Sequence, residues 1–527
     1  MVSSLLSLLG ALAIARDEIL DAIVANQIIR RFLFRLVSTP SIPPEVFEEA
    51  LSCLMTLSED NLPMGQAITD DQETWCYDEL LKLKAGGGPG AVLACGVLHN
   101  VFSSLQWLDH SPGKEGACDA ILVPSLSRAL EQAGGVKTNG NGASSHPGIA
   151  QVALEILASI GTNLQNTLEK GNRVPFGPGK TEPEWDGIEE KVAGGDADAM
   201  EVDGGSDNED NEDDEDDKDD EDDEESDDDN IEDIEADMER VTGVDDDIKE
   251  GSLDDLPTLR ELIQTAIPQL VRLTNIAINC DEDITIQSHA FSALNNIAWT
   301  LSCIDFTGDE NANILAAWAP AARKVWQKTI TPVLNSDNAD LNLATLVTGL
   351  AWAVARSLSG DTPSDGTQHR KFIALYQAAK AHDSKQDKMQ NETKAEGDEQ
   401  EDPLQGLGVK CIGVLGSLAR DPAPIKTNRD VGVFLMMILG HPDTPVADVI
   451  EALNQVFDIY GDEEAACDKE VFWKDNFLKH LNELLPRLKA IAKTVDKRKA
   501  EELRTKADEA IMNLGRFIQY KKKNPPR

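Results

Sequence analysis

The sequence predicts an all-α fold: a superhelical solenoid of stacked helical repeats, interrupted by a long disordered acidic insert. Three observations support this prediction. Apolar residues recur at helical spacing in many segments of the 527-residue chain, and alternating strand patterns are nearly absent. Several of the helices also resemble one another. Aromatic residues make up only 5% of the chain while Leu and Ala are abundant, which is typical of helical cores.

The similar helices are rich in Ala and Leu and contain small residues. They lie at residues 49–61, 91–103, 152–164, 290–302, 344–358, 410–422, 448–462 and 508–520. Leu54 and Leu98 occupy matching positions 44 residues apart, and Leu415 and Leu453 are 38 apart. A period of about 40–47 residues is typical of armadillo and HEAT repeats, which stack to bury a continuous core and leave one concave face. An unrelated run of helices is the alternative.

The chain divides by composition into three expected parts. Residues 1–170 are expected to form N-terminal armadillo-like repeats, 171–251 a disordered acidic loop, and 252–527 C-terminal HEAT-like repeats. A second polar, disordered loop is expected at about 382–403. Residues 196–250 hold 32 acidic and 3 basic side chains, a net charge of -29 out of -47 for the chain. Like-charge repulsion and the scarcity of apolar residues prevent a packed core there.

The charge of the chain argues against direct binding of nucleic acid, because phosphate would be repelled, and it favours a basic protein partner. The eight cysteines are at least 19 residues apart, so no zinc motif is present and a reducing compartment is expected. The long uncharged stretches contain too many polar residues for a membrane span. The first 15 residues match either the apolar part of a signal peptide without its basic start or, preferably, the first helix of the array.

Catalytic motifs are absent from the sequence. The segment Gly177–Thr181 resembles the end of a phosphate-binding loop, but Val174 replaces the first glycine and Pro178 lacks an N–H. We therefore predict no enzyme activity, no cofactor and no metal site. The acidic tract would bind divalent cations only weakly, since it lacks the spacing of a calcium loop.

The acidic tract has two interpretations. It is a solvating linker, or it is an electrostatic mimic of nucleic acid that attracts a Lys/Arg-rich client protein. The density of charge favours the second. The candidate client-binding residues of this loop are Asp213, Asp214, Glu215, Asp216, Asp217, Asp219, Asp220, Glu221, Asp222 and Asp223.

The segment 290–302 resembles the third helix of armadillo repeats, in which an Asn side chain binds the backbone of an extended peptide. Asn296 matches that Asn, and Asn100 does so in its own helix. Importin-α has a Trp four residues earlier, where this chain has Ser292 and Gly96. An inter-repeat hydrogen bond is the equal alternative for both Asn residues. We add Trp299 and Trp352 as groove candidates.

Two further features have open interpretations. Core packing is the alternative role for most tryptophans, namely Trp299, Trp318, Trp326, Trp352 and Trp473. The basic clusters at 497–499 and 521–523 match either nuclear signals or solvated helix ends.

The chain resembles the symportin family, the fungal co-import chaperones of ribosomal proteins, and its animal HEAT-repeat relatives, in the segments 50–61, 292–302 and 346–358 and in the ending NLGRFIQYKKKNPP. The resemblance covers most of the chain. It implies a shuttling monomer, cytoplasmic and nuclear, that binds two basic large-subunit proteins associated with 5S ribosomal RNA and a transportin-type carrier. The family carries an N-terminal basic segment with a Pro-Tyr signal, whereas this sequence begins at an apolar helix and contains no Pro-Tyr dipeptide.

The sequence and the resemblance together predict a noncatalytic chaperone and import adaptor. Its concave repeat surface and acidic loop would hold the basic client until ribosomal RNA replaces the carboxylates. Two alternatives remain: a nuclear transport receptor of the importin type, and a histone chaperone that relies on the acidic tract.

Overall fold

The computed structural model describes residues 1–526 except 40, 132, 134–146, 169–252, 307–310, 337–340, 359, 364–365 and 391–401. Within these residues the structure is helical, and its β structure is limited to an isolated bridge between Leu108 and Ser111. The predicted all-α repeat fold is therefore confirmed. None of the helices in the described ranges combines the length and the apolar character that crossing a membrane requires.

The N-terminal helices are α1 (Val2–Ala15), α2 (Asp17–Ala25), α3 (Gln27–Ser38), α4 (Pro44–Ser58), α5 (Leu62–Thr69), α6 (Cys76–Ala85), α7 (Pro89–Ser104), α8 (Val123–Glu131) and α9 (Pro147–Leu168). The chain continues with α11 (Pro257–Glu261), α12 (Ile267–Thr274), α13 (Asp281–Ser302), α14 (Ala312–Val325), α15 (Thr331–Leu334), α16 (Leu341–Ser357) and α17 (Gln368–Gln390). It ends with α18 (Leu407–Ala419), α19 (Ile425–Gly440), α20 (Val446–Tyr460), α21 (Phe477–Thr494) and α22 (Glu501–Lys523). Short helical turns connect them, including η2 (Asp119–Ile121) and η7 (Asp468–Trp473).

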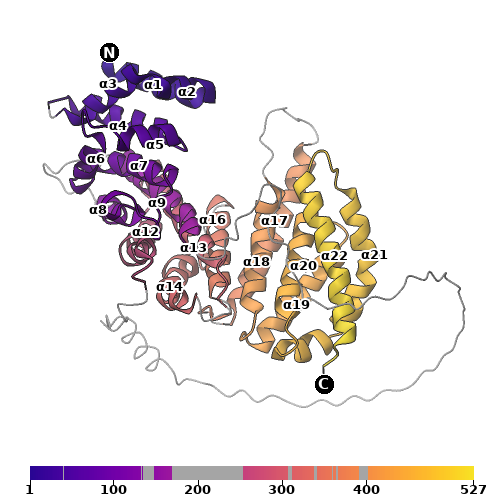
Figure 1. Cartoon of the computed structure of the whole chain (residues 1–527). Helices are drawn as coiled ribbons and strands as arrows, with labels where there is room; N and C mark the ends of the chain where they lie inside the picture. The colour runs from indigo at the N-terminus through magenta and orange to yellow at the C-terminus, as the bar shows by residue number, and fades with distance from the viewer. Residues whose placement is uncertain are drawn as a thin grey trace, which may run out of the picture. The chain divides into compact units, whose positions relative to one another are not determined.

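One set of helices forms a continuous row, in which each helix contacts the next: α1, α4, α7, α9, α13, α16, α18, α20 and α22. Figure 1 shows these helices following one another in chain order. The eight similar segments recognised in the sequence all fall on this row, from α4 to α22. Helices α9 and α13 pack directly against each other, although residues 169–252 lie between them in the chain. The array is thus continuous across the acidic insert.

Local sequence signals explain where the helices begin. The side chain of Asn26 accepts hydrogen bonds from the N–H groups of Ile28 and Ile29 at the start of α3. Asn61 does the same for Met64 in α5. These caps satisfy N–H groups that have no partner inside the helix. Proline occupies the first turn of α4 and α7, where its missing N–H costs nothing.

Glycines let the helices of the row approach closely. A Cβ atom on Gly413 of α18 would lie 2.1 Å from Cε2 of Trp352 on α16. A Cβ on Gly161 of α9 would lie 2.8 Å from Ile297 on α13. Only glycine leaves room for the neighbouring side chain at these contacts. The small residues noticed in the sequence therefore set the spacing of the row.

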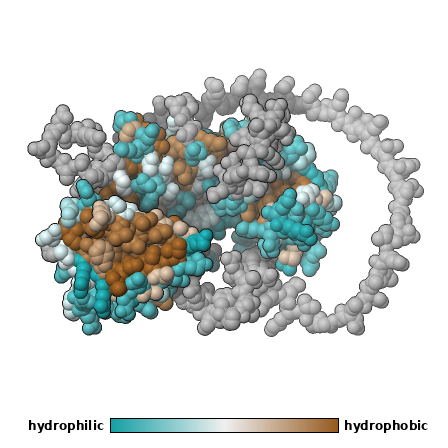
Figure 2. All heavy atoms as spheres, turned by 90° about the horizontal axis from the view of Figure 1, so that it is seen from above, coloured by the Kyte–Doolittle hydropathy of each residue, from teal (hydrophilic) through white to brown (hydrophobic). Residues whose placement is uncertain are grey.

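The first helix packs against α4 and buries Leu6 and Ala13, so residues 2–15 are the first member of the row in this structure. Its other face is apolar and exposed, with Leu5 50% and Leu8 53% accessible. Figure 2 shows a broad apolar patch on this side of the molecule.

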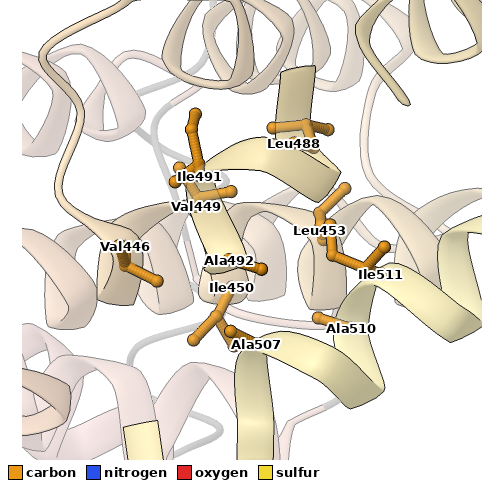
Figure 3. A pocket seen from close by; sticks show the side chains of 10 residues that line it. All are labelled: Val446, Val449, Ile450, Leu453, Leu488, Ile491, Ala492, Ala507, Ala510 and Ile511. Carbon is orange, nitrogen blue, oxygen red and sulfur yellow. The ribbon is translucent and has the colours of Figure 1, made fainter. Parts of the chain in front are cut away.

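Apolar side chains alone line a small cavity in the last repeat (Figure 3). Side chains of α20, α21 and α22 converge on a cavity of about 10 Å³, lined by Val446, Val449, Ile450, Leu453, Leu488, Ile491, Ala492, Ala507, Ala510 and Ile511. This volume is about that of one water molecule. The cavity belongs to the core and is too small for a ligand.

Two expected loops fall wholly or partly outside the described residues. Residues 171–251, the expected acidic loop, lie outside the described residues. Helix α17 continues to Gln390, so the first part of the polar loop expected at 382–403 is helical. The remainder of that loop, 391–401, also lies outside the described residues.

Candidate functional site

The acidic candidates of residues 213–223 lie outside the described residues. The groove candidates Asn100, Asn296, Trp299 and Trp352 all lie on this row, on α7, α13, α13 and α16. The structure brings only the two tryptophans together.

Asn100 and Asn296 connect neighbouring helices. The amide nitrogen of Asn100 donates to the carbonyl oxygen of Met55, 2.8 Å away on α4, and to Oγ of Ser58 at 3.4 Å. The amide nitrogen of Asn296 donates to the carbonyl oxygen of Ala158 on α9 at 3.2 Å and to Oγ1 of Thr162 at 3.1 Å. An amide nitrogen has two hydrogens, so both donors of each Asn are occupied within the protein.

Trp299 and Trp352 form an aromatic pair that joins α13 to α16. Their ring centroids lie 5.1 Å apart, and the rings meet edge to face at 76°. The guanidinium of Arg356 lies 5.7 Å from the centre of the Trp299 ring. Trp299 is 36% exposed, whereas Trp352 is half-buried. The pair thus presents an aromatic and cationic surface to solvent.

Of the remaining candidate tryptophans, Trp318 and Trp326 have core roles, as the alternative interpretation held, and Trp473 is half-buried. Trp318 and Trp326 are buried, and their indole nitrogens donate to Ser357 Oγ at 2.8 Å and Gln368 Oε1 at 2.9 Å. Trp473 donates to Oδ2 of Asp468 at 3.0 Å. Buried indole N–H groups need such partners.

The indole nitrogen of Trp352 is different, because it is buried and has no hydrogen-bond partner among the described residues. The same holds for Oε1 of Gln455 on α20 and for Oδ1 of Asn295 on α13. Sequence reasoning missed Gln455 and Asn295. The side chain of Asn295 contacts a glycine of α16, and that of Gln455 contacts a glycine of α18. These glycines were the only signal of the contacts that the sequence offered.

Glu451 lies one helical turn before Gln455 and accepts a hydrogen bond from Gln455 Nε2 at 2.7 Å. Burial and, to a smaller extent, the charge of Asp458 raise the pKa of the Glu451 carboxyl to about 7. The hydrogen bond from Gln455 and the positive charge of Arg356 act in the opposite direction. Glu451 is therefore a half-buried carboxyl that titrates near neutral pH.

A second polar constellation joins α7, η2 and α9. Nδ1 of His99 lies 2.9 Å from Oδ1 of Asp119, and Nε2 lies 2.9 Å from Oγ of Ser159. These contacts have the order of a Ser-His-Asp triad. Ser159 is in the middle of α9, however, where the backbone N–H groups are bonded within the helix and do not face a substrate oxyanion. The constellation therefore acts as a clamp between three elements.

Lys521, in the second basic cluster, is completely buried. Its Nζ lies 2.7 Å from Oδ1 of Asp468, and the two side chains are 0% and 1% exposed. Lys522 donates to Asn482 at 2.9 Å. Lys521 fits neither interpretation of residues 521–523, because a fully buried ammonium is reached neither by a carrier nor by solvent.

The thiols of this protein are unreactive where they are buried. All eight cysteines are free, and six of them are buried. Burial raises the pKa of Cys53 to about 11 and that of Cys95 to about 12, so the thiolate is not populated at neutral pH. In the described parts of the chain, no group of three or more His, Cys, Asp or Glu side chains is placed to hold a metal ion.

The fold and these contacts define a class: an α-helical repeat protein whose conspicuous polar and aromatic groups line one row of helices. The family model described as "SYO1-like, TPR repeats" matches residues 280–525. Symportin 1 of Chaetomium thermophilum is 60% identical to all of this chain, which covers 77% of that protein. The chain belongs to the symportin family, which confirms the resemblance seen in the sequence.

Two shorter matches agree with this assignment. The Schizosaccharomyces pombe armadillo repeat protein involved in nucleocytoplasmic transport, Syo2, is 40% identical over 21% of this chain and 17% of its own length. Synchronized import protein 1 of Saccharomyces cerevisiae is 33% identical over 22% of this chain and 19% of its own length. Yeast importin-β aligns with 98% of this chain and 50% of its own, at 11% identity and a TM-score of 0.38, too low to carry an argument about fold.

Proposed function

We propose that this protein is a noncatalytic chaperone and nuclear import adaptor for basic ribosomal proteins of the large subunit, those associated with 5S ribosomal RNA. The observation that carries the proposal is the match to a symportin over all of this chain and 77% of that protein. The names of two further relatives refer to import and nucleocytoplasmic transport. On this proposal the protein is a monomer that shuttles between cytoplasm and nucleus with a transportin-type carrier.

In this proposal the acidic insert and the row of helices bind different parts of the client. Residues 196–250 carry a net charge of -29, which attracts a Lys/Arg-rich client and covers its RNA-binding surface. The continuous row offers a long surface for an extended segment of the same client. Because α9 and α13 pack directly against each other, the array is continuous across the insert. The insert and the row therefore belong to one array, and in this proposal both bind the same client.

The insert also supports a rival function, that of a histone chaperone acting through the acidic tract alone. Replacing the 32 acidic residues of 196–250 by their amides keeps the length of the insert and removes its charge. Binding of a purified basic ribosomal protein should weaken and lose most of its salt dependence, yet persist through the row. Loss of nearly all binding would favour the histone chaperone.

A transport receptor of the importin type is the other rival. Such a receptor would itself recognise nuclear signals and nucleoporins. Binding of nucleoporin repeats by the purified protein, without a carrier, would favour that function. The adaptor should instead enter the nucleus of permeabilised cells only when a carrier is added.

A further inference from the structure

The C-terminal helix pair carries positive charge in a chain that is otherwise strongly acidic. Residues 477–499 hold seven basic and two acidic side chains, a net charge of +5, against -47 for the whole chain. Figure 1 shows α21 and α22 side by side at the C-terminal end of the array, and the two helices pack against each other. The basic cluster at 497–499 lies in the turn that joins them.

Six of these basic side chains are exposed along α21 and the turn that follows it, and we call them the basic stripe. They are Lys479, Lys489, Lys493, Lys497, Arg498 and Lys499. The exposed residues of α21 include 479, 482–483, 486, 489–490 and 493, which recur every three or four positions and so lie along one face of the helix. At 1.5 Å per residue, this face is about 21 Å long from Lys479 to Lys493.

The charges of the basic stripe are not used inside the protein. Its six side chains form no ion pair with any described residue, whereas the neighbouring Lys474 and Lys506 are paired with Glu470 and Glu502. Glu483 is the single acidic residue in the sequence of α21. Grouped cations without internal partners create a local positive potential, which attracts an anionic partner.

The turn of the basic stripe is held by hydrogen bonds. Oδ1 of Asp496 accepts from the backbone N–H of Arg498 at 2.9 Å, and the backbone N–H of Ala500 donates to the carbonyl oxygen of Asp496 at 3.0 Å. Nη1 of Arg504, on α22, donates to the carbonyl oxygen of Val495 at 3.2 Å. A surface that is already ordered loses less entropy when it binds a partner.

The chemistry of the basic stripe fits a phosphate backbone better than a protein surface. Specific protein interfaces have an apolar core. No large apolar side chain of residues 477–501 is exposed, and the neutral residues among the lysines include Asn482, Pro486 and Ala490. Phosphate contacts need only positive charge, and a straight row of lysines matches a rod that carries phosphates at regular intervals.

We propose that the basic stripe binds the phosphate backbone of double-stranded RNA. The proposal rests on the proposed function for the source of that RNA, which is the ribosomal RNA that receives the client. The basic stripe holds an RNA helix against the adaptor while phosphates replace the carboxylates of the insert on the client. The total charge of the chain does not prevent this local contact, because exposed charges more than about 8 Å apart are largely screened at physiological ionic strength.

The release of counterions sets the expected salt dependence. Each phosphate neutralised by a basic side chain changes the logarithm of the binding constant by about -0.9 per decade of salt concentration, so six contacts give a slope of about -5. By the same relation, one contact at 0.15 M salt contributes about a fivefold factor in affinity relative to 1 M salt. The loss of two contacts should therefore weaken binding about 30-fold.

The test is fluorescence anisotropy of a labelled 20-base-pair RNA duplex, titrated with the full chain in which the 32 acidic residues of 196–250 are replaced by their amides. This parent variant removes the carboxylates that compete with phosphate for the basic stripe. The logarithm of its binding constant should fall with a slope of about -5 between 50 and 200 mM salt. Adding Lys489→Gln/Lys493→Gln should reduce the slope by about 2 and lower the affinity at 0.15 M salt about 30-fold.

The control is Lys324→Gln/Lys328→Gln in the same parent variant. It removes the same charge from two exposed lysines that are also four residues apart, at the end of α14 and in the helical turn after it, and it should bind the duplex as the parent does. Thermal unfolding of both double variants checks that the fold is kept. A labelled 20-residue peptide of Glu and Gly tests the rival partner, an acidic protein segment.

Three results would overturn the proposal: no binding of the duplex at 50 mM salt, equal binding by the two double variants, or tighter binding of the acidic peptide than of the duplex. Binding of a basic ribosomal protein to the unaltered chain, measured alongside, separates this proposal from the proposed function. If that protein binds and the duplex does not, only the RNA contact fails. If the duplex binds the basic stripe and no ribosomal protein binds, the proposed function fails instead.

Discussion

The buried ion pair at the end of the array tests which contacts stabilise the last repeat. Lys521 on α22 reaches Asp468 in η7, with Nζ and Oδ1 2.7 Å apart and both side chains almost inaccessible. The ammonium lies 5.4 Å from the ring centre of Phe472 and 5.7 Å from that of Phe517. We predict that Lys521→Met destabilises this repeat strongly, because it leaves the Asp468 carboxylate buried with only Trp473 as a hydrogen-bond donor.

The magnitude follows from the burial. Removing one partner of a fully buried pair costs about 3–5 kcal/mol, whereas replacing both by neutral groups of similar volume is often neutral. The single variant should therefore lose about 3–5 kcal/mol of unfolding free energy. The double variant Asp468→Asn/Lys521→Met should recover most of this loss. Because repeats interact mainly with their neighbours, the effect should be confined to the C-terminal end.

Urea unfolding with hydrogen exchange on α22 measures this effect. Amides of α21 and α22 should lose protection in Lys521→Met while those of α4 and α7 keep theirs. The reasoning is refuted if the single variant loses less than about 1 kcal/mol, or if the double variant is no more stable than the single one.

Two further predictions concern the packing of the row and its pH dependence. Gly416→Ala should lower the free energy of unfolding by about 1–3 kcal/mol, because the new Cβ meets the side chain of Gln455. Gly515→Ala has open space around it and should stabilise α22 by about 0.5–1 kcal/mol. The midpoints of urea unfolding compare the two variants. Burial lowers the pKa of His99, but its contacts with Asp119 outweigh this, so the pKa is raised. The stability that protonated His99 contributes is complete below pH 6.5 and is lost as pH rises through the raised pKa. The free energy of unfolding should therefore fall between pH 6 and pH 8, and Asp119→Asn should make this fall smaller. An unchanged slope in the variant contradicts the prediction.

The sequence predicted the continuous row well because its signals are local. Helical periodicity, small residues within the helices and Gly or Pro at their ends all act within one helix, and a common repeat marks the helices that stack. The match between segments 49–61 to 508–520 and helices α4 to α22 follows from this.

The contacts of the site could not be predicted in the same way, because they depend on pairs of residues far apart in the chain. Asn100 and Asn296 have the position of armadillo groove residues, but their amide hydrogens point to the preceding helix. Lys521 belongs to a run of three lysines, and nothing in that run distinguishes the one that meets Asp468, 53 residues away.

Similarly, the glycines of α18 were visible as small residues, but the side chains that rest on them come from α16 and α20. Their partners are separated by about 40–60 residues, and the sequence carries no local mark of the pairing. A continuous row was therefore predictable, whereas the chemistry of its surface required the structure.

The central proposal is that this protein binds basic proteins of the large ribosomal subunit. Affinity purification of the full chain from cell extract at physiological ionic strength, followed by mass spectrometry, tests it most directly. Large-subunit proteins associated with 5S ribosomal RNA should be the main components recovered, and the amide variant of residues 196–250 should recover less of them. Recovery of histones without ribosomal proteins would contradict the account.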